Sequence, residues 1–477
     1  MNGFIAHTNK LNMQIMNILQ QLILTKEKTE KVDETFTNEV NLALTEQPSS
    51  LQMENTYIPE LPNGTEDGQF LALDLGGTNF RAILLHLEHG NVIREEVKRY
   101  HIPDELRFGS GLKLFDFLAE CLVDFVSEQD LEDVPLPLGF TFSFPMSHHS
   151  LDSGYLVTWT KTFNCPDVVN MDVVKLLQQS LEKYGHNHIE VMAILNDTTG
   201  TLVEGARIDN RTRIGIVLGT GSNACYVERA DRVQHWETER HNEHHVIINI
   251  EWGAFGDNGS LDFLKTDFDR SLDLRSLLAT SFTFEKYISG NYLGELVRTV
   301  LETLRDKKLF LAKAPPELFP LEWSFTSDLI SLIEQDTIDG QQHQIKKILS
   351  DFGYEQHHYD ADDLAIIQFV SALTSYRAAK LVSINTAIML NRMDEDDITI
   401  AIDGSLYKHH PRMKTWLENI IAERAPNKLV NTVLSLMLFD VLSSDLLQFR
   451  LILAEDGSGK GAGLAAAIAV RVSQCRE

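Results

Sequence analysis

The stretch FLALDLGGTNFRAILL, residues 70–85, consists of two apolar, strand-like runs joined by a polar turn. Gly76 and Gly77 permit a tight turn whose backbone N–H groups face outward, where they can bind phosphate. Thr78 and Asn79 add polar side chains to that turn. Most glycine pairs after a strand only reverse the chain, so one such turn is weak evidence for a ligand site.

The same pattern recurs in both halves of the chain. It is found in IGIVLGTGSNACYV (214–227) and ITIAIDGSLY (398–407), and a further Gly-rich turn, EDGSGKGAG (455–463), opens directly into a helical run. The recurrence of strand-and-turn units in both halves predicts an α/β fold with two related lobes. The turns would bring N–H groups to a shared cleft and cradle the phosphates of a nucleotide.

Two familiar nucleotide motifs nearly match these turns and are rejected. Gly459-Lys460 is followed by Gly461, where a P-loop needs Ser or Thr to hold Mg²⁺. Residues 219–224 resemble a dinucleotide fingerprint, which is the basis for an alternative function as a NAD-dependent enzyme. However, the apolar alternation continues through Tyr226, which predicts a strand where that fingerprint requires a helix.

The composition is that of a globular protein with an acidic surface. The 477 residues suffice for two lobes, and 69 acidic against 42 basic side chains give a formal net charge of −27. This charge argues against nucleic-acid and anionic-membrane partners. The four cysteines lack metal-ligand spacing, and no stretch has the form of a secretion signal or a membrane span. We therefore expect a soluble, cytosolic protein with reduced thiols.

Several segments predict elements without chemistry of their own. Residues 11–24 form an amphipathic pattern that predicts a helix packed on the core, with docking to the mitochondrial outer surface as the alternative. Residues 47–68 are typical of a connector, and residues 365–392 and 412–424 of helices. The histidine-rich stretch 241–245 lacks regular spacing, so we expect a solvated loop rather than a metal site.

The segment ILNDTTGTLVEGA (194–206) carries the candidate catalytic group. A strand is predicted to end at Leu195, and a helix to begin at Asn196-Asp197. A carboxylate at a helix N-terminus is stabilised as the anion, so Asp197 should be ionised and able to accept a proton. The alternative is an aspartate that only caps the helix.

Four further segments end strands or begin helices with polar groups. They are Ser143 and Pro145 in GFTFSFP, Thr160 and Lys161 in LVTWTKTF, Glu251 and Asn258 in INIEWGAFGDNG, and Glu285 in FEKYISGNYLGELVR. Each residue alone is typical of a protein surface. Together they offer hydroxyl, amide, ammonium and carboxylate groups, which suit a neutral polyhydroxylated ligand and favour a catalytic Asp197.

In their order along the chain, these segments resemble the hexokinase family. The matching stretches are LALDLGGTNFR, LPLGFTFSFP, WTKTF, NDTTGT, GTGSNACY, EWGAFGDNG, FEKYISGNYLGELVR, DGSLYKHHP and EDGSGKGAG, which together cover most of residues 50–470. The length is similar to that of the single-unit eukaryotic form. The resemblance implies an actin-like ATPase (ribonuclease H-like) fold, with two lobes that close over a hexose and ATP with Mg²⁺. It also implies phosphorylation of the sugar 6-hydroxyl group, the first step of glycolysis.

The resemblance assigns a role to each matching residue. It implies that Asp197 is the catalytic base and that Lys161 is a cation near the transferred phosphoryl group. The sugar would be held by Ser143, Phe144, Pro145, Thr160, Lys161, Asn196, Asp197, Asn223, Glu251, Asn258 and Glu285. The nucleotide would be held by Asp74, Gly76, Gly77, Thr78, Asn79, Thr220, Gly221, Asp403, Gly404, Ser405, Asp456, Gly457 and Ser458. Mg²⁺ would enter with ATP, so no separate protein metal site is expected.

The resemblance also implies an order of domains. Residues 1–66 would form an N-terminal helix and connector of the large lobe, and residues 67–198 the small lobe. Residues 199–455 would complete the large lobe, and residues 456–477 would form a C-terminal helix that returns to the small lobe.

Two departures from the family bear on activity. Phe282 stands where hexokinases usually carry glutamine, and one lost hydrogen bond, worth about 1 kcal/mol, predicts a raised KM or an altered sugar preference. Between Pro426 and Ala454 the chain is longer than is usual in the family and includes an apolar segment at 429–447. These departures favour one alternative, a catalytically weakened relative that acts as a glucose sensor or regulator.

Overall fold

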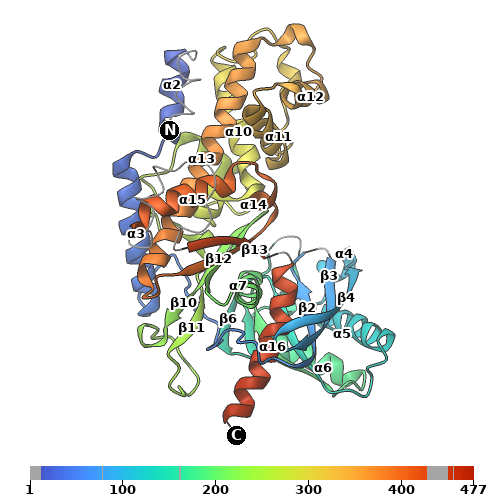
Figure 1. Ribbon diagram of the computed structural model, residues 1–477. Coiled ribbons are helices and arrows are strands. Elements are labelled where there is room, and N and C mark those ends of the chain that lie inside the picture. Colours follow the sequence, from blue (N-terminus) through green and yellow to red (C-terminus); the bar gives the residue numbers. More distant parts are fainter. Residues whose placement is uncertain (1–11, 78, 161–162, 427–448, 455, 477) are drawn as a thin grey trace.

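The computed structural model describes residues 12–77, 79–160, 163–426, 449–454 and 456–476. The predicted site residues Thr78 and Lys161, and the apolar segment 429–447, lie outside the described residues. None of the helices in these ranges is long and apolar enough to cross a membrane. Figure 1 shows the chain arranged around two sheets, with helices between and around them.

The larger sheet is built mainly by the middle and the C-terminal third of the chain. Among the described residues it has six strands, in the order β1-β11-β10-β9-β12-β13. Their bounds are β1 Glu54–Asn55, β9 Thr212–Leu218, β10 Ser222–Arg229, β11 His245–Asn249, β12 Ile398–Asp403 and β13 Phe449–Leu453. Strands β9, β10 and β11 pair antiparallel, whereas β12 joins β9 and β13 in parallel.

The smaller sheet repeats this arrangement. Its described strands have the order β4-β3-β2-β5-β8, with β2, β3 and β4 antiparallel and β5 parallel to both β2 and β8. Their bounds are β2 Gly68–Leu75, β3 Asn79–Glu88, β4 Asn91–His101, β5 Leu136–Phe142 and β8 Ile189–Leu195, and a separate hairpin joins β6 Met146–Ser150 to β7 Ser153–Leu156. The strand pairs predicted at 70–85 and 214–227 and the α/β class are confirmed. Because strand β10 follows residues 219–221, the rejection of the dinucleotide fingerprint is confirmed as well.

Helices cover the outer faces of both sheets (Figure 1). Those around the smaller sheet are α4 Asp104–Arg107, α5 Gly111–Glu128 and α6 Val173–Lys183. Those around the larger sheet are α2 Met13–Leu19, α3 Lys26–Leu44, α8 Asp267–Arg275, α9 Thr283–Ile288, α10 Gly290–Asp306, α11 Ser327–Asp339, α12 His343–Asp351, α13 Ala361–Arg392, α14 Ser405–His409 and α15 Met413–Arg424. The helices predicted at 365–392 and 412–424 are confirmed as α13 and α15. Ile15, Leu19 and Leu22 are buried in the core of the larger sheet, which confirms core packing for the N-terminal helix.

Two helices lie back to back between the sheets. Helix α7, Asp197–Ile208, packs on the larger sheet, and helix α16, Gly457–Arg476, packs on the smaller one and on α7. Glycines permit this close packing. A Cβ atom on Gly461 would lie 2.1 Å from the carbonyl oxygen of Gly200, and one on Gly139 would lie 1.8 Å from that of Ala462.

The predicted Gly457-Ser458 turn is wrong, because both residues lie in the first turn of α16. The chain turns at Asp456, whose φ of 54° is left-handed. The glycines that follow are needed where α16 crosses α7 and the smaller sheet, so they serve helix packing rather than a loop.

Candidate active site

The candidate catalytic base stands where strand β8 passes into helix α7. The side chain of Asn196, and not that of Asp197, caps the helix, since its Oδ1 accepts a hydrogen bond of 2.8 Å from the Thr198 N–H. Asp197 is the first helical residue and is partly exposed, and its Oδ1 accepts a hydrogen bond of 3.2 Å from Thr198 Oγ1. The carboxylate of Asp197 is therefore not used as the cap, and it lies in the favourable field of the helix N-terminus.

A group of asparagine amides surrounds the carboxylate of Glu251. Its Oε1 accepts hydrogen bonds from the Nδ2 atoms of Asn249 at 2.7 Å, Asn223 at 3.0 Å and Asn196 at 3.4 Å. These residues come from the ends of β11 and β8 and from β10, so the larger and smaller sheets meet at this point. The structure thus brings together the predicted sugar ligands Asn196, Asn223 and Glu251.

Acidic neighbours set the charge of this group. Burial raises the pKa of Glu251 to about 7, and the nearby carboxylates of Asp197 and Glu285 act in the same direction, whereas the amides of Asn249 and Asn223 lower it. Glu285, in the first turn of α9, accepts a hydrogen bond of 3.0 Å from the Ser222 N–H. Asp197, Glu251 and Glu285 therefore form one acidic surface, suited to accept hydrogen bonds from hydroxyl groups.

The other predicted sugar ligands are more scattered. Ser143 is buried after β5, and its N–H donates to the Leu75 carbonyl at 3.0 Å. The ring of Phe144 packs against Phe142, Trp159 and Phe163 in the core, and Pro145 and Thr160 follow in partly exposed loops. Asn258 instead donates to Glu39 of α3 at 3.0 Å and 3.1 Å. The side chain of Asn258 is thus bound to α3 and makes no described hydrogen bond to the Glu251 group.

Three of the predicted nucleotide residues, Asp74, Asp456 and Ser458, meet at the start of α16. Asp74 at the end of β2 accepts hydrogen bonds from Arg81 and, at 3.0 Å, from Ser458 Oγ. Arg81 also pairs with Asp456 at 2.8 Å. Burial raises the pKa of Asp403, and the charges of Asp456 and Asp197 add to this effect. The carboxylates of Asp456 and of the candidate base Asp197 therefore lie close enough to Asp403 to disfavour its ionised form.

A cavity of about 270 Å³ adjoins these turns on the larger lobe. It is lined by Thr220, Gly290, Asn291, Glu295, Trp323, Phe325, Thr326, Ser327, Asp328, Ser331, Ser405 and Leu406. Of these, Thr220 and Ser405 are predicted nucleotide ligands. Gly404, with a φ of 116°, passes so close to Leu218 that a Cβ atom would lie 2.4 Å from its carbonyl carbon. This close passage brings the turn at Gly219–Gly221 beside Ser405 at the rim of the cavity.

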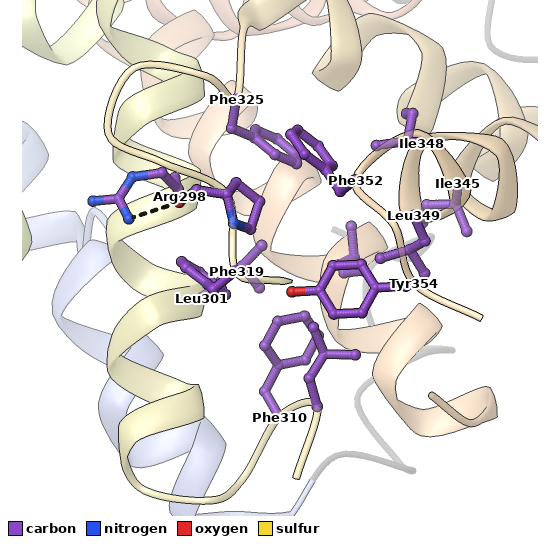
Figure 2. A pocket seen from close by; sticks show the side chains of 13 residues that line it. Arg298, Leu301, Phe310, Phe319, Phe325, Ile345, Ile348, Leu349, Phe352 and Tyr354 are labelled. Carbon is purple, nitrogen blue, oxygen red and sulfur yellow. Dashed lines mark hydrogen bonds between the residues drawn. The ribbon is translucent and has the colours of Figure 1, made fainter. Parts of the chain in front are cut away.

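A second, smaller pocket is apolar. Figure 2 shows it between α10, α12 and α13, lined by side chains such as Leu301, Phe319, Ile345 and Phe352. Its volume of about 20 Å³ holds roughly one water molecule, so it is too small for a sugar or a nucleotide.

Comparison with known proteins decides the family. Sequence models described as hexokinase match residues 14–207 and 213–468 of this chain. The chain belongs to the hexokinase family. It is 37% identical to the hexokinase of Brugia malayi over 431 residues, which is 89% of this chain and 72% of that protein. It is 36% identical to mouse hexokinase-1 over 470 residues, 96% of this chain and 46% of that protein. The chain therefore spans about half the length of the hexokinase-1 proteins that it matches.

Solved hexokinase structures confirm the actin-like α/β fold. The hexokinase from Schistosoma mansoni complexed with glucose has a TM-score of 0.82 and 35% identity, over 95% of this chain and 98% of that one. Another hexokinase crystal structure has a TM-score of 0.79 and 30% identity, over 96% and 99% of the two chains.

Sequence reasoning missed several residues of this candidate site. Asn249 is the last residue of β11, two residues before Glu251, and a polar residue at a strand end close to a predicted ligand could have indicated it. Arg81 ends the motif GGTNFR and could have been singled out as its one cation. Asn291 and Trp323 reach the large cavity only through the packing of α10 against the following loop, and no local signal marks them.

Proposed function

We propose that this chain transfers the terminal phosphoryl group of MgATP to the 6-hydroxyl group of glucose or a related hexose. One observation carries the proposal: the Asp197 carboxylate, which does not cap its helix, lies beside the amide and carboxylate groups of Asn196, Asn223 and Glu251. A base next to several hydroxyl-binding groups is what phosphorylation of a sugar requires.

In this proposal Asp197 orients the 6-hydroxyl group and accepts its proton. Phosphoryl transfer passes through a loose transition state, so the nucleophile needs little deprotonation until late and a weakly basic carboxylate suffices. Glu251 and Glu285 accept hydrogen bonds from other sugar hydroxyls and fix the orientation of the ring. Ser143, Phe144, Pro145, Thr160 and Asn258 are proposed to complete the sugar pocket, and Lys161 to neutralise charge on the transferred group.

We propose that the nucleotide occupies the large cavity and the adjoining turns. The cavity lined by Thr220 and Ser405 has room for a nucleoside, and Asp74 and Ser458, which are joined by a hydrogen bond, are proposed to lie toward the phosphates. Gly76, Gly77, Thr78, Asn79 and Gly221 would face the phosphates, together with Asp403, Gly404, Asp456 and Gly457. Mg²⁺ arrives as a substrate with ATP. Closure of the lobes would exclude water, whose attack on ATP competes with that of the sugar.

A coupled assay on purified protein tests this function. Glucose and MgATP are supplied, and glucose 6-phosphate is detected through its dehydrogenase. Formation of the product, lost in Asp197→Asn, supports the kinase. Glucose binding without turnover would instead support a sensor or regulator.

We also propose the domain limits 1–66, 67–198, 199–455 and 456–477 given by the family resemblance.

We further propose a cytosolic location. Association with the mitochondrial outer surface through the N-terminus is the alternative. Co-sedimentation with mitochondria, compared before and after deletion of residues 1–11, distinguishes the two locations.

A further inference from the structure

Asn249 occupies a buried position behind the proposed sugar site. It is the last residue of β11, its side chain is 4% exposed, and it stands opposite Cys225 and Glu54 in the sheet. Its Oδ1 accepts a hydrogen bond of 2.8 Å from Asn223 Nδ2, and its Nδ2 donates one of 2.7 Å to Glu251 Oε1. Asn249 is therefore a link between two groups that are proposed to touch the sugar.

Glu251 needs such a link because regular secondary structure does not orient it. Its φ of 54° is left-handed, which few non-glycine residues adopt, and it follows the end of β11. The amides converge on one oxygen, Oε1, and the bond from Asn249 is the shortest of them. Within the described chain, no hydrogen bond reaches the other oxygen, Oε2. An amide-bound Oε1 leaves Oε2 to accept a hydrogen bond from a ligand.

The charges around Glu251 make the amide donors more important. The charged groups that face it are the carboxylates of Asp197 on α7, Glu285 on α9 and Glu54 on β1. All of them disfavour the ionised form of Glu251, which is the form that accepts hydrogen bonds at both oxygens. The N–H groups of Asn249 and Asn223 oppose this effect.

We propose that Asn249 is a positioning residue for sugar binding, which holds Oε1 of Glu251 and leaves Oε2 directed toward a sugar hydroxyl. This inference rests on the proposed function of Glu251 as a sugar ligand. Asn249 itself does not touch the substrate. Its contribution should therefore appear in sugar binding and in the pH dependence of binding, and not in the chemical step.

The test compares Asn249→Asp with a matched control, Asn55→Asp. Asn249→Asp keeps the acceptor for Asn223, removes the donor to Glu251 and adds a carboxylate. Asn55 is likewise buried in the larger sheet, but its Nδ2 donates to the His235 carbonyl and makes no described hydrogen bond to Glu251. Glucose KM, kcat, the pH profile of kcat/KM and the melting temperature are measured for both. Asn249→Ala is a second variant, which removes both hydrogen bonds without adding a charge.

For Asn249→Asp we expect glucose KM to rise about tenfold to hundredfold, the range for a lost hydrogen bond to a charged group. We expect kcat to stay within about threefold of the wild-type value, because the base is untouched. The acidic limb of kcat/KM should move to higher pH, since the lost donor and the added carboxylate both favour protonated Glu251. Asn55→Asp should lower the melting temperature without moving this limb.

An unchanged glucose KM and pH profile in Asn249→Asp would overturn the proposal. A fall in kcat as large as the rise in KM, with no shift in the pH profile, would also overturn it. So would loss of folding in both Asn249 variants while Asn55→Asp folds. Each of these outcomes assigns Asn249 a structural role only. Glu251→Gln is measured in parallel. If that variant keeps the wild-type glucose KM, the proposed role of Glu251 as a ligand fails, independently of the result for Asn249.

Discussion

Gly461 of α16 lies against Gly200 of α7 so closely that a Cβ atom on Gly461 would stand 2.1 Å from the Gly200 carbonyl oxygen. Helix α7 begins with Asp197 and packs on the larger sheet, whereas α16 packs on the smaller one. At this contact between two glycines, the helix that begins with the proposed base meets the helix that begins at the proposed nucleotide residues.

Gly461→Ala should lower stability by about 1–3 kcal/mol or more, because the backbone of α7 cannot move aside as a side chain can. Thermal unfolding followed by circular dichroism measures the effect. Gly463→Ala on the same helix is the control, since the nearest atoms to its Cβ belong to side chains, the Leu85 Cδ1 atom at 2.7 Å and the Ala72 Cβ atom at 3.7 Å, and not to the backbone. Equal melting temperatures for the two variants would contradict this account of the packing.

Asp197→Ala should abolish most turnover while glucose binding stays within about tenfold of the wild-type affinity, because a general base contributes about 10²–10⁴ to rate and little to ground-state binding. The coupled assay gives kcat, and the fluorescence of Trp252, next to Glu251, reports binding. The exposed Asp231→Ala, whose partner is Arg229 on the surface, should leave both values unchanged. A normal kcat in Asp197→Ala would disprove the assignment.

Glu251→Gln should change how stability depends on pH. The pKa of Glu251 is about 7 in the folded protein, above the ordinary value of 4.5, so the folded state binds this proton more tightly than the unfolded state. The stability contributed by protonation is complete below pH 4.5 and is lost as pH rises to about 7.

The melting temperature of the wild type should therefore fall, relative to Glu251→Gln, over this pH interval. The other titratable groups largely cancel in the comparison. Parallel curves for the two proteins would show that the pKa of Glu251 is not raised.

Phe282→Gln should improve sugar binding. Phe282 precedes α9 with a φ of 56°, and its ring lies near Gly253, beside Glu285. A glutamine there could donate or accept one hydrogen bond in the pocket, worth about 1 kcal/mol, which predicts a several-fold lower glucose KM.

A lower KM in Phe282→Gln could come from the added amide or from removal of the aromatic ring. Phe282→Leu separates these two causes, because it removes the ring without adding an amide. A lower KM in both variants would mean that the ring obstructs the pocket. Unchanged KM values in both would remove Phe282 from the account of sugar affinity.

Local sequence patterns predicted many of the strands, turns and helix starts of this protein. The runs at 70–85 and 214–227 predicted their strands and turns because apolar alternation and glycine pairs act over a few residues. The start of α7 at Asp197 followed from a strand end and a capping residue in the same way, and the family resemblance followed from motifs in their order.

Only the tertiary structure decided which side chain caps α7, where α16 begins and which polar groups meet at Glu251. Whether Asp197 is a cap or a separate carboxylate depended on where the Asn196 side chain points, and the helical start at Gly457 depended on what those glycines pack against. Asn249 and Glu251 are near in sequence, yet their contact with Asn196 and Asn223 joins three separate strands or strand ends. Sequence patterns report the conformation of neighbouring residues, whereas hydrogen bonds and charges between distant segments exist only once both sheets are assembled.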